Sequence, residues 1–127
     1  MGVERAAVVC GNGSMDEITN VGKTRISEIK NGQVDTYEIK PTDFGIDYAD
    51  VKDIAGGICE ENAKITKDIL SGVKGPKRDI VLLNAGAAIY VAGIADTMAE
   101  GIKKAEESID SGAAARVLEK LIVFSKN

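Results

Sequence analysis

The chain has 127 residues, of which 44% are hydrophobic and 28% charged, with a net charge of −4. This length predicts a single domain that can bury a real core. The negative charge and scattered basic residues argue against nucleic acid as a partner. The most apolar stretch, residues 80–95, is too short to span a bilayer, and no secretory signal is visible, so the sequence predicts a cytoplasmic chain with no membrane partner.

The predicted strands come first. Residues 6–10 (AAVVC) are an apolar run before a glycine, which predicts a fully buried strand. Residues 24–30 and 33–40 flank Asn31-Gly32, and Asn-Gly between two β-type runs is the strongest short signal for a hairpin. One buried strand cannot form a parallel sheet by itself, so the chain is expected to belong to something larger.

Four helices are predicted after residue 50. The first follows Gly56-Gly57, and the second begins near Pro76, a residue that suits the first helical position. The second is apolar on nearly all sides, which predicts that it lies inside a larger body. Thr97 and Glu100 have the spacing of a capping box before a third helix. One face of that helix is apolar, and its residues are Met98, Ile102, Ala105 and Ile109. A final helix follows Ser111-Gly112.

Several polar residues have structural interpretations. Lys74, Lys77 and Arg78 surround a Gly-Pro turn and are expected to form a solvated helix start. Asp43 and Asp110 are expected to cap helices or turns.

The remaining candidates for chemistry are few. Cys10 and Cys59 have no partner at metal-ligand spacing, so buried, reduced thiols are expected. Because the sequence has no histidine, a Ser-His or Cys-His nucleophilic pair is excluded. Asn84, inside the apolar helix, is expected to be a satisfied core amide.

A glycine-containing loop, residues 11–17 (GNGSMDE), follows the first predicted strand. It lacks the third glycine of a dinucleotide-binding fingerprint and the Gly-Lys-Ser/Thr of a P-loop. Its adjacent carboxylates, Asp16 and Glu17, suit a hard cation such as Mg²⁺, which takes one or two carboxylates, waters and substrate phosphates. The alternative is that one of these carboxylates only caps a following helical turn.

Long segments of the sequence resemble the C-terminal part of the anthranilate phosphoribosyltransferase family, in order and over nearly the whole chain. They are GVERAAVVCGNGSMDEIT (2–19), PTDFGI (41–46), GGICEENAKITKDILSGVKGPKRDIVLLNAGAAIYVAG (56–93) and ESIDSGAAARVLEKL (107–121). The resemblance implies that residues 1–127 form a single partial α/β domain of the nucleoside phosphorylase and phosphoribosyltransferase type. The expected content is one buried strand and a β-hairpin packed with four or more helices.

The resemblance implies transfer of phosphoribosyl from phosphoribosyl pyrophosphate to anthranilate, a step of tryptophan biosynthesis. It also implies that Asp16 and Glu17 hold the Mg²⁺ that neutralises the pyrophosphate leaving group. Family members additionally have a helical N-terminal domain and a Gly-Thr-Gly-Gly-Asp loop that cradles pyrophosphate, and this sequence has neither. Cys10 stands where the family often has histidine, which leaves the role of this position open.

One possibility is a related phosphorylase-type enzyme that acts on a nucleoside, but the segments MDEIT (15–19) and LNAGAAIYVAG (83–93) favour the anthranilate branch. Two further hypotheses concern the anthranilate branch itself. In the first, the chain is a C-terminal fragment of the enzyme that is inactive alone and works with the missing N-terminal half on another polypeptide. In the second, it is a truncated, non-catalytic paralogue that binds a partner or associates with itself. The apolar helix and the shortage of strands motivate both, because both imply uncovered apolar surface.

Overall fold

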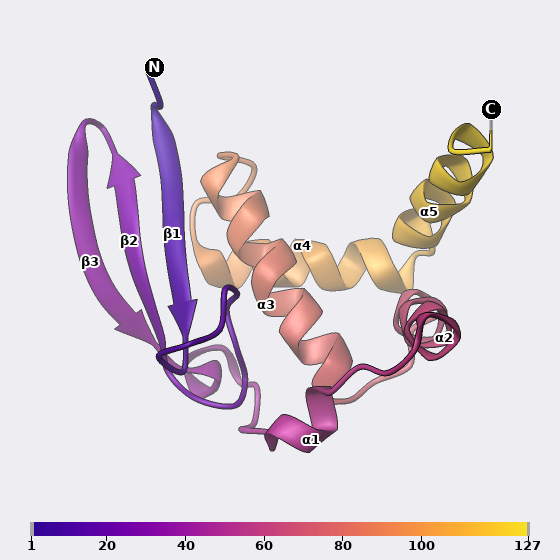
Figure 1. Cartoon of the computed structure of the whole chain (residues 1–127). Helices are drawn as coiled ribbons and strands as arrows, with labels where there is room; N and C mark the ends of the chain where they lie inside the picture. Colours follow the sequence, from indigo (N-terminus) through magenta and orange to yellow (C-terminus); the bar gives the residue numbers. More distant parts are fainter. Residues whose placement is uncertain (1, 127) are drawn as a thin grey trace.

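In the computed structural model, which describes residues 2–126, a small sheet comes first and the helices follow (Figure 1). The strands are β1 (Arg5–Gly11), β2 (Thr24–Lys30) and β3 (Gln33–Ile39). A short 3-10 helix, η1 (Pro41–Phe44), leads to the helices α1 (Val51–Ile54), α2 (Cys59–Leu70), α3 (Pro76–Val91), α4 (Met98–Asp110) and α5 (Ala113–Phe124). The mixed α/β class is thus confirmed, and the five α-helices of the described residues agree with the expected four or more.

The sheet is antiparallel throughout, in the order β1-β2-β3. The predicted hairpin is confirmed: Asn31 and Gly32 join β2 to β3 with φ angles of 53° and 75°, the left-handed values that a tight hairpin turn requires. The neighbour of β1 is this hairpin, since Arg5 pairs with Lys30 and Gly11 with Thr24. The first strand is therefore not the lone member of a parallel sheet.

The expectation that β1 is fully buried was wrong. Its burial alternates, and Val8 is 70% exposed on the outer face of the sheet. Cys10 is also exposed, as is Cys59 at the start of α2, so the prediction of buried thiols was wrong as well. Val9 packs against the core on one face of β1, and Val8 and Cys10 point to the opposite face, because successive side chains of a strand alternate between faces.

The core lies between the inner face of the sheet and the helices α3 and α4. Ile26 on β2 pairs with Val9 on β1, and their side chains pack on the face of the sheet that meets the helices. The buried core residues are Ile18, Ile26, Ile69, Leu82, Leu83, Ile102, Ala105 and Ile109. The predicted apolar face of α4 is confirmed by Ile102, Ala105 and Ile109, but α3 is not buried all round, because Val81 is exposed.

Two glycines set the distance between α3 and α4. A Cβ on Gly86 would lie 2.6 Å from the Ile102 nitrogen, and one on Gly101 would lie 3.0 Å from the Gly86 carbonyl carbon and closer still to its oxygen. Neither position has room for a methyl group. The backbones of α3 and α4 therefore cross in direct contact.

Helix starts follow the sequence closely. Pro76 is the first residue of α3. At the start of α4 the Glu100 N–H donates to Thr97 Oγ1 (3.2 Å), while Glu100 Oε2 accepts from the N–H of Asp96 (3.0 Å). Asp43 accepts from the Lys40 N–H at 2.8 Å, which confirms its capping role.

In the described part of the chain, no helix combines the length and hydropathy that crossing a bilayer requires.

The prediction of a solvated basic helix start around Pro76 is wrong for Arg78, whereas Lys74 is exposed as predicted. Arg78 is only 2% exposed. Its guanidinium donates to Asp110 (2.7 Å), Glu106 (3.4 Å) and the Gly72 carbonyl (3.2 Å). Asp110 is thus the partner of a buried cation and not a cap, and Arg78 ties the start of α3 to the end of α4.

The Arg78–Asp110 pair predicts a pH dependence of stability. The hydrogen bond from Arg78 lowers the pKa of Asp110 in the folded chain, so the stabilisation is present above the unfolded-state pKa of about 3.9 and is lost as pH falls through the lower folded value. We expect Asp110→Asn to lower the thermal midpoint at pH 6, and the gap from the unsubstituted chain to close as pH falls below about 4. Asp96→Asn changes an exposed carboxylate that forms no ion pair within residues 2–126, and it should show no such convergence. A pH-independent gap for Asp110→Asn would contradict the pairing.

Candidate functional site

The loop that carries Asp16 and Glu17 turns sharply at the end of β1. The Gly11 N–H donates to the Met15 carbonyl (2.9 Å), and the Ser14 and Met15 N–H groups donate back to the Gly11 carbonyl (3.0 and 2.8 Å). A side chain at Gly11 would collide with the Glu17 carbonyl oxygen, so the end of β1 touches the carboxylate segment directly. The turn therefore fixes where this segment leaves the sheet.

Both carboxylates are available for a ligand. Asp16 is exposed and Glu17 is half-buried. Within residues 2–126 neither carboxylate accepts a hydrogen bond or forms an ion pair, and no helix begins at this point. The alternative that one of them caps a helical turn is therefore wrong.

Glu17 lines a pocket of about 290 Å³ between the segment after β1 and the helices α2 and α3. Ile65, Ile69 and Ile80 make much of its wall, and Lys77 lies in it as well. The Lys77 ammonium donates to the Ala55 carbonyl beyond the end of α1. Sequence reasoning missed Lys77 as a pocket residue, because the Gly-Pro turn beside it indicated a solvated position.

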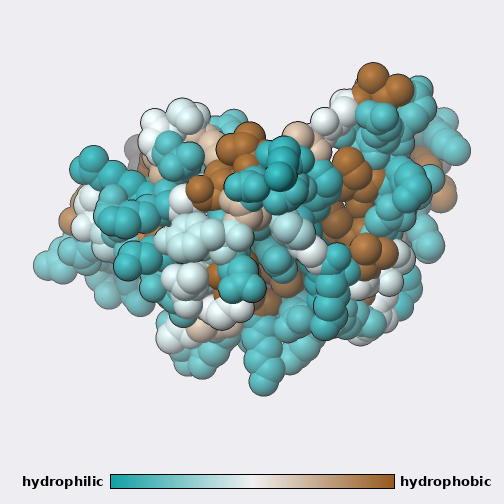
Figure 2. Space-filling model, turned by 90° about the horizontal axis from the view of Figure 1, so that it is seen from below, coloured by the Kyte–Doolittle hydropathy of each residue, from teal (hydrophilic) through white to brown (hydrophobic). Residues whose placement is uncertain are grey.

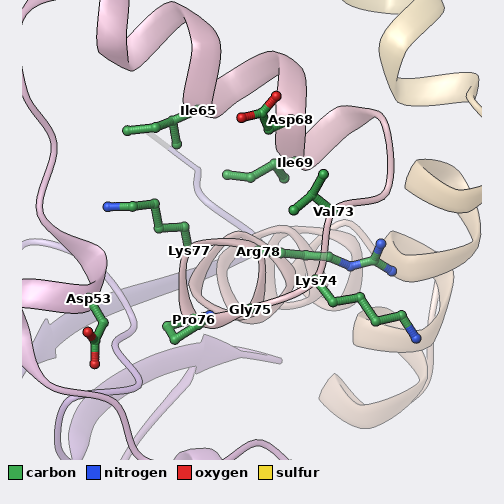
Figure 3. Close-up of a pocket in the computed structure, with 10 residues that line it drawn as sticks. All are labelled: Asp53, Ile65, Asp68, Ile69, Val73, Lys74, Gly75, Pro76, Lys77 and Arg78. Atoms are coloured by element: carbon green, nitrogen blue, oxygen red, sulfur yellow. The ribbon is translucent and has the colours of Figure 1, made fainter.

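A neighbouring pocket of about 270 Å³ shares Lys77 and lies where α2 approaches the start of α3 (Figure 3). Ile65, Ile69 and Val73 form its apolar side, and the acidic groups of Asp53 and Asp68 lie at its rim. Figure 3 shows that the consecutive residues Lys77 and Arg78 point in opposite directions, one toward α1 and the other toward α4. Arg78 is engaged in its ion pairs, so Lys77 is the cation on the side of Glu17.

The donor set fits Mg²⁺ only as part of a site. In the described ranges no three or more Asp, Glu, Cys or His side chains are grouped in a way that could hold a metal ion. Two oxygen donors without competing partners suit a cation that completes its shell with water and substrate phosphate. The pair is thus compatible with a shared Mg²⁺ and not with a closed structural metal centre.

Asn84 holds the segment from the side of α3. Its Oδ1 accepts from the Ile18 N–H (2.9 Å), and its Nδ2 donates to the carbonyls of Ile18 (2.7 Å) and Ile80 (2.8 Å). The prediction of a satisfied core amide is confirmed. The partner could not be predicted from the sequence, because Ile18 lies 66 residues away.

A separate polar cluster joins the far end of the sheet to α3. Arg5 lies 4.5 Å from the centre of the Tyr90 ring and 3.8 Å from Glu28, and Tyr37 donates to Glu28 at 3.0 Å. Burial, and then the hydrogen bond to Glu28, raise the pKa of Tyr37 to about 12.

Tyr37 should therefore lose its proton at a higher pH than an ordinary tyrosine. Its neutral form is favoured in the folded chain, so its stabilisation is complete below the unfolded-state pKa of about 10 and is lost as pH rises through about 12. We expect phenolate absorbance near 295 nm to show a step at that pH, which Tyr37→Phe removes. If the absorbance lost in Tyr37→Phe belongs to a step near pH 10 and not near pH 12, the Glu28 contact is contradicted.

Comparisons with known proteins assign the family. The model of a glycosyl transferase family, a/b domain, matches residues 1–115. The chain belongs to this family. The anthranilate phosphoribosyltransferase of Acetivibrio thermocellus is 47% identical over 127 residues, which are 100% of this chain and 37% of that protein. Its counterpart from Methanocorpusculum labreanum is 50% identical over 98% of this chain and 36% of its own length.

Solved structures agree with the fold. Anthranilate phosphoribosyltransferase from Thermus thermophilus matches with a TM-score of 0.86 and 36% identity over 97% of this chain and 36% of its own. The Saccharomyces cerevisiae enzyme in complex with PRPP and Mg matches with a TM-score of 0.78 and 33% identity over 89% of this chain and 33% of its own. The chain thus spans little more than a third of the length of the relatives that it matches, which confirms the expected partial correspondence.

Proposed function

We propose that this chain supplies the metal-binding wall of an anthranilate phosphoribosyltransferase site, acting in tryptophan biosynthesis in the cytoplasm. The reaction would transfer phosphoribosyl from phosphoribosyl pyrophosphate to the amine of anthranilate and release pyrophosphate. The observation that carries the proposal is the unpaired Asp16–Glu17 pair, held between β1 and α3 in a chain similar to these enzymes along its whole length.

The role of the pair follows from its charge. A bound Mg²⁺ would neutralise charge that develops on the pyrophosphate leaving group. Asp16 and Glu17 would hold that cation on the side of this chain, and without it they would repel the same pyrophosphate. Lys77 is the basic residue in the pocket of Glu17, and its ammonium already binds the Ala55 carbonyl. Groups that orient the pyrophosphate must therefore come from elsewhere, so the chain should be inactive alone.

We place the partner, the remaining part of such an enzyme, on the free edge of β1. The edges of the sheet differ in character: β1 carries the uncharged run Ala6–Cys10, whereas β3 carries Asp35 and Glu38. Uncharged edge strands invite another strand, and charged ones resist it. Exposed Val8, on the outer face of β1, would gain a cross-strand neighbour from such an addition.

Reconstitution tests the proposal. Mixing the chain with a polypeptide that carries the remaining upstream two-thirds of a family member should give Mg²⁺-dependent release of pyrophosphate that requires anthranilate. Neither polypeptide alone should release it. A complex that forms without activity would contradict the catalytic role, and the absence of any complex would contradict the partner assignment.

The non-catalytic alternative has one supporting feature, the apolar surface of α5. Val117, Leu121 and Phe124 are exposed there, and Figure 2, which views the molecule from below, shows hydrophobic patches toward the side where α2 and α5 lie in Figure 1. An apolar stripe of this kind can bury itself against a second copy. Sedimentation of the isolated chain decides: a monomer at all concentrations contradicts self-association, and a dimer that Leu121→Lys dissociates supports it.

A further inference from the structure

We infer that Asn84 is a positioning residue for the Asp16–Glu17 pair: its amide fixes the backbone beside the carboxylates, so that both are in place before a cation arrives. The inference rests on the proposed function, because it assigns a purpose to the metal-binding pair. It adds a residue that lies outside the carboxylate loop and touches neither metal nor substrate.

The hydrogen bonds of Asn84 are specific to an amide. Its oxygen accepts from the Ile18 N–H while its nitrogen donates to the Ile18 and Ile80 carbonyls, at 2.7 to 2.9 Å. Only one orientation of an amide satisfies all three groups, and neither a carboxylate nor an apolar side chain can do so. Asn84 thus pairs with Ile18 as an adjacent strand would, although it lies on a helix.

Ile18 is the residue through which Asn84 can position the carboxylates. It follows Glu17 directly and is only 2% exposed, so its backbone groups would otherwise be buried without partners. The next two residues have their own anchors: the Thr19 N–H donates to Thr24 Oγ1 (3.1 Å), and Asn20 Nδ2 donates to the Pro76 carbonyl (2.9 Å). Within residues 2–126, Asn84 supplies the side-chain hydrogen bonds closest along the chain to the carboxylates.

Asn84 also connects the pair to the rest of the pocket. It lies seven residues after Lys77 on α3, which is two helical turns and hence nearly the same side of the helix. Lys77 and Ile80 line the pocket of Glu17. One rigid helix thereby sets the position of the carboxylate segment and of the nearby cation together. Groups that orient metal ligands are commonly worth about 10–100-fold in metal affinity, and a contact made through the backbone should lie at the lower end.

The test uses the full chain with Mn²⁺, a paramagnetic substitute for Mg²⁺ that also takes oxygen ligands. In the unsubstituted chain, Mn²⁺ should broaden the amide signals of Asp16 and Glu17 first. Asn84→Leu should speed hydrogen exchange at the Ile18 amide and weaken the Mn²⁺ effect about tenfold. Asn84→Asp, which can accept from the Ile18 N–H but cannot donate to the carbonyls, should behave like Asn84→Leu.

A control separates positioning from general destabilisation. Leu82→Ala removes a buried α3 side chain that lies in the core and not in the pocket of Glu17. It should lower the thermal midpoint and leave the Mn²⁺ titration unchanged. Unchanged Mn²⁺ broadening in Asn84→Leu, or unchanged exchange at Ile18, overturns the inference and leaves the proposed function standing. Failure of Mn²⁺ to broaden Asp16 and Glu17 in the unsubstituted chain, also when pyrophosphate is present, overturns both.

Discussion

Gly101→Ala should strongly destabilise the chain, because Gly101 is the point at which α4 touches the backbone of α3. The added carbon would lie 3.0 Å from the Gly86 carbonyl carbon and still closer to its oxygen, and backbone cannot swing away as a side chain can. Overpacking of this kind costs about 3 kcal/mol, whereas the gain in helix propensity returns about 1 kcal/mol. The free energy of unfolding should therefore fall by about 2 kcal/mol or more, and the thermal midpoint by roughly 5–10 °C.

The matched control is Gly2→Ala, since a Cβ there would meet nothing within 4 Å. It should stay within about 0.5 kcal/mol of the unsubstituted chain. Chemical denaturation of both variants, followed by circular dichroism, gives the comparison. Equal stability of the two variants would show that α3 and α4 do not cross in backbone contact.

Asp16→Asn combined with Glu17→Gln should abolish Mg²⁺-dependent transfer in the reconstituted enzyme. The substitutions keep the size of both side chains and remove both negative charges, so the loop and the fold should be unaffected. Loss of a group that stabilises developing charge typically costs about 100-fold or more in rate. We also expect part of the lost rate to return at high Mg²⁺ concentration if the pair acts by binding the cation.

An exposed double substitution elsewhere provides the reference. Asp47→Asn with Glu60→Gln removes the same number of charges from exposed positions outside the pocket of Glu17. It should leave both the rate and the Mg²⁺ dependence unchanged. Retention of full activity by the Asp16–Glu17 variant, with the complex intact, would show that this chain does not hold the metal.

Features that are local in sequence could be predicted well. The Asn31-Gly32 hairpin and the Thr97 cap depend on a few consecutive residues, and the apolar face of α4 depends on a 3.6-residue period. In each case the chemistry that forms the element lies inside it. The adjacent carboxylates of the loop could likewise be picked out as candidates from their position after a strand.

Features that depend on partners far away in the sequence could not be predicted. Arg78 has a solvated local context and is buried because Asp110, 32 residues on, pairs with it. The apolar run of β1 indicated a strand buried on both faces, yet Val8 on its outer face is exposed, because the helical layer packs against the inner face of the sheet. The sequence predicted that the Asn84 amide would find hydrogen-bond partners. That these partners belong to the carboxylate segment depends on how α3 crosses the end of β1.

The unequal edges of the sheet bear on stoichiometry. The sheet has two edges, β1 and β3, and the β3 edge carries Asp35 and Glu38, which resist the addition of a strand. Such a sheet can be extended at the β1 edge only. Repeated addition of copies would need two receptive edges. If the partner adds to β1 as proposed, we expect a closed one-to-one complex in preference to a growing fibre.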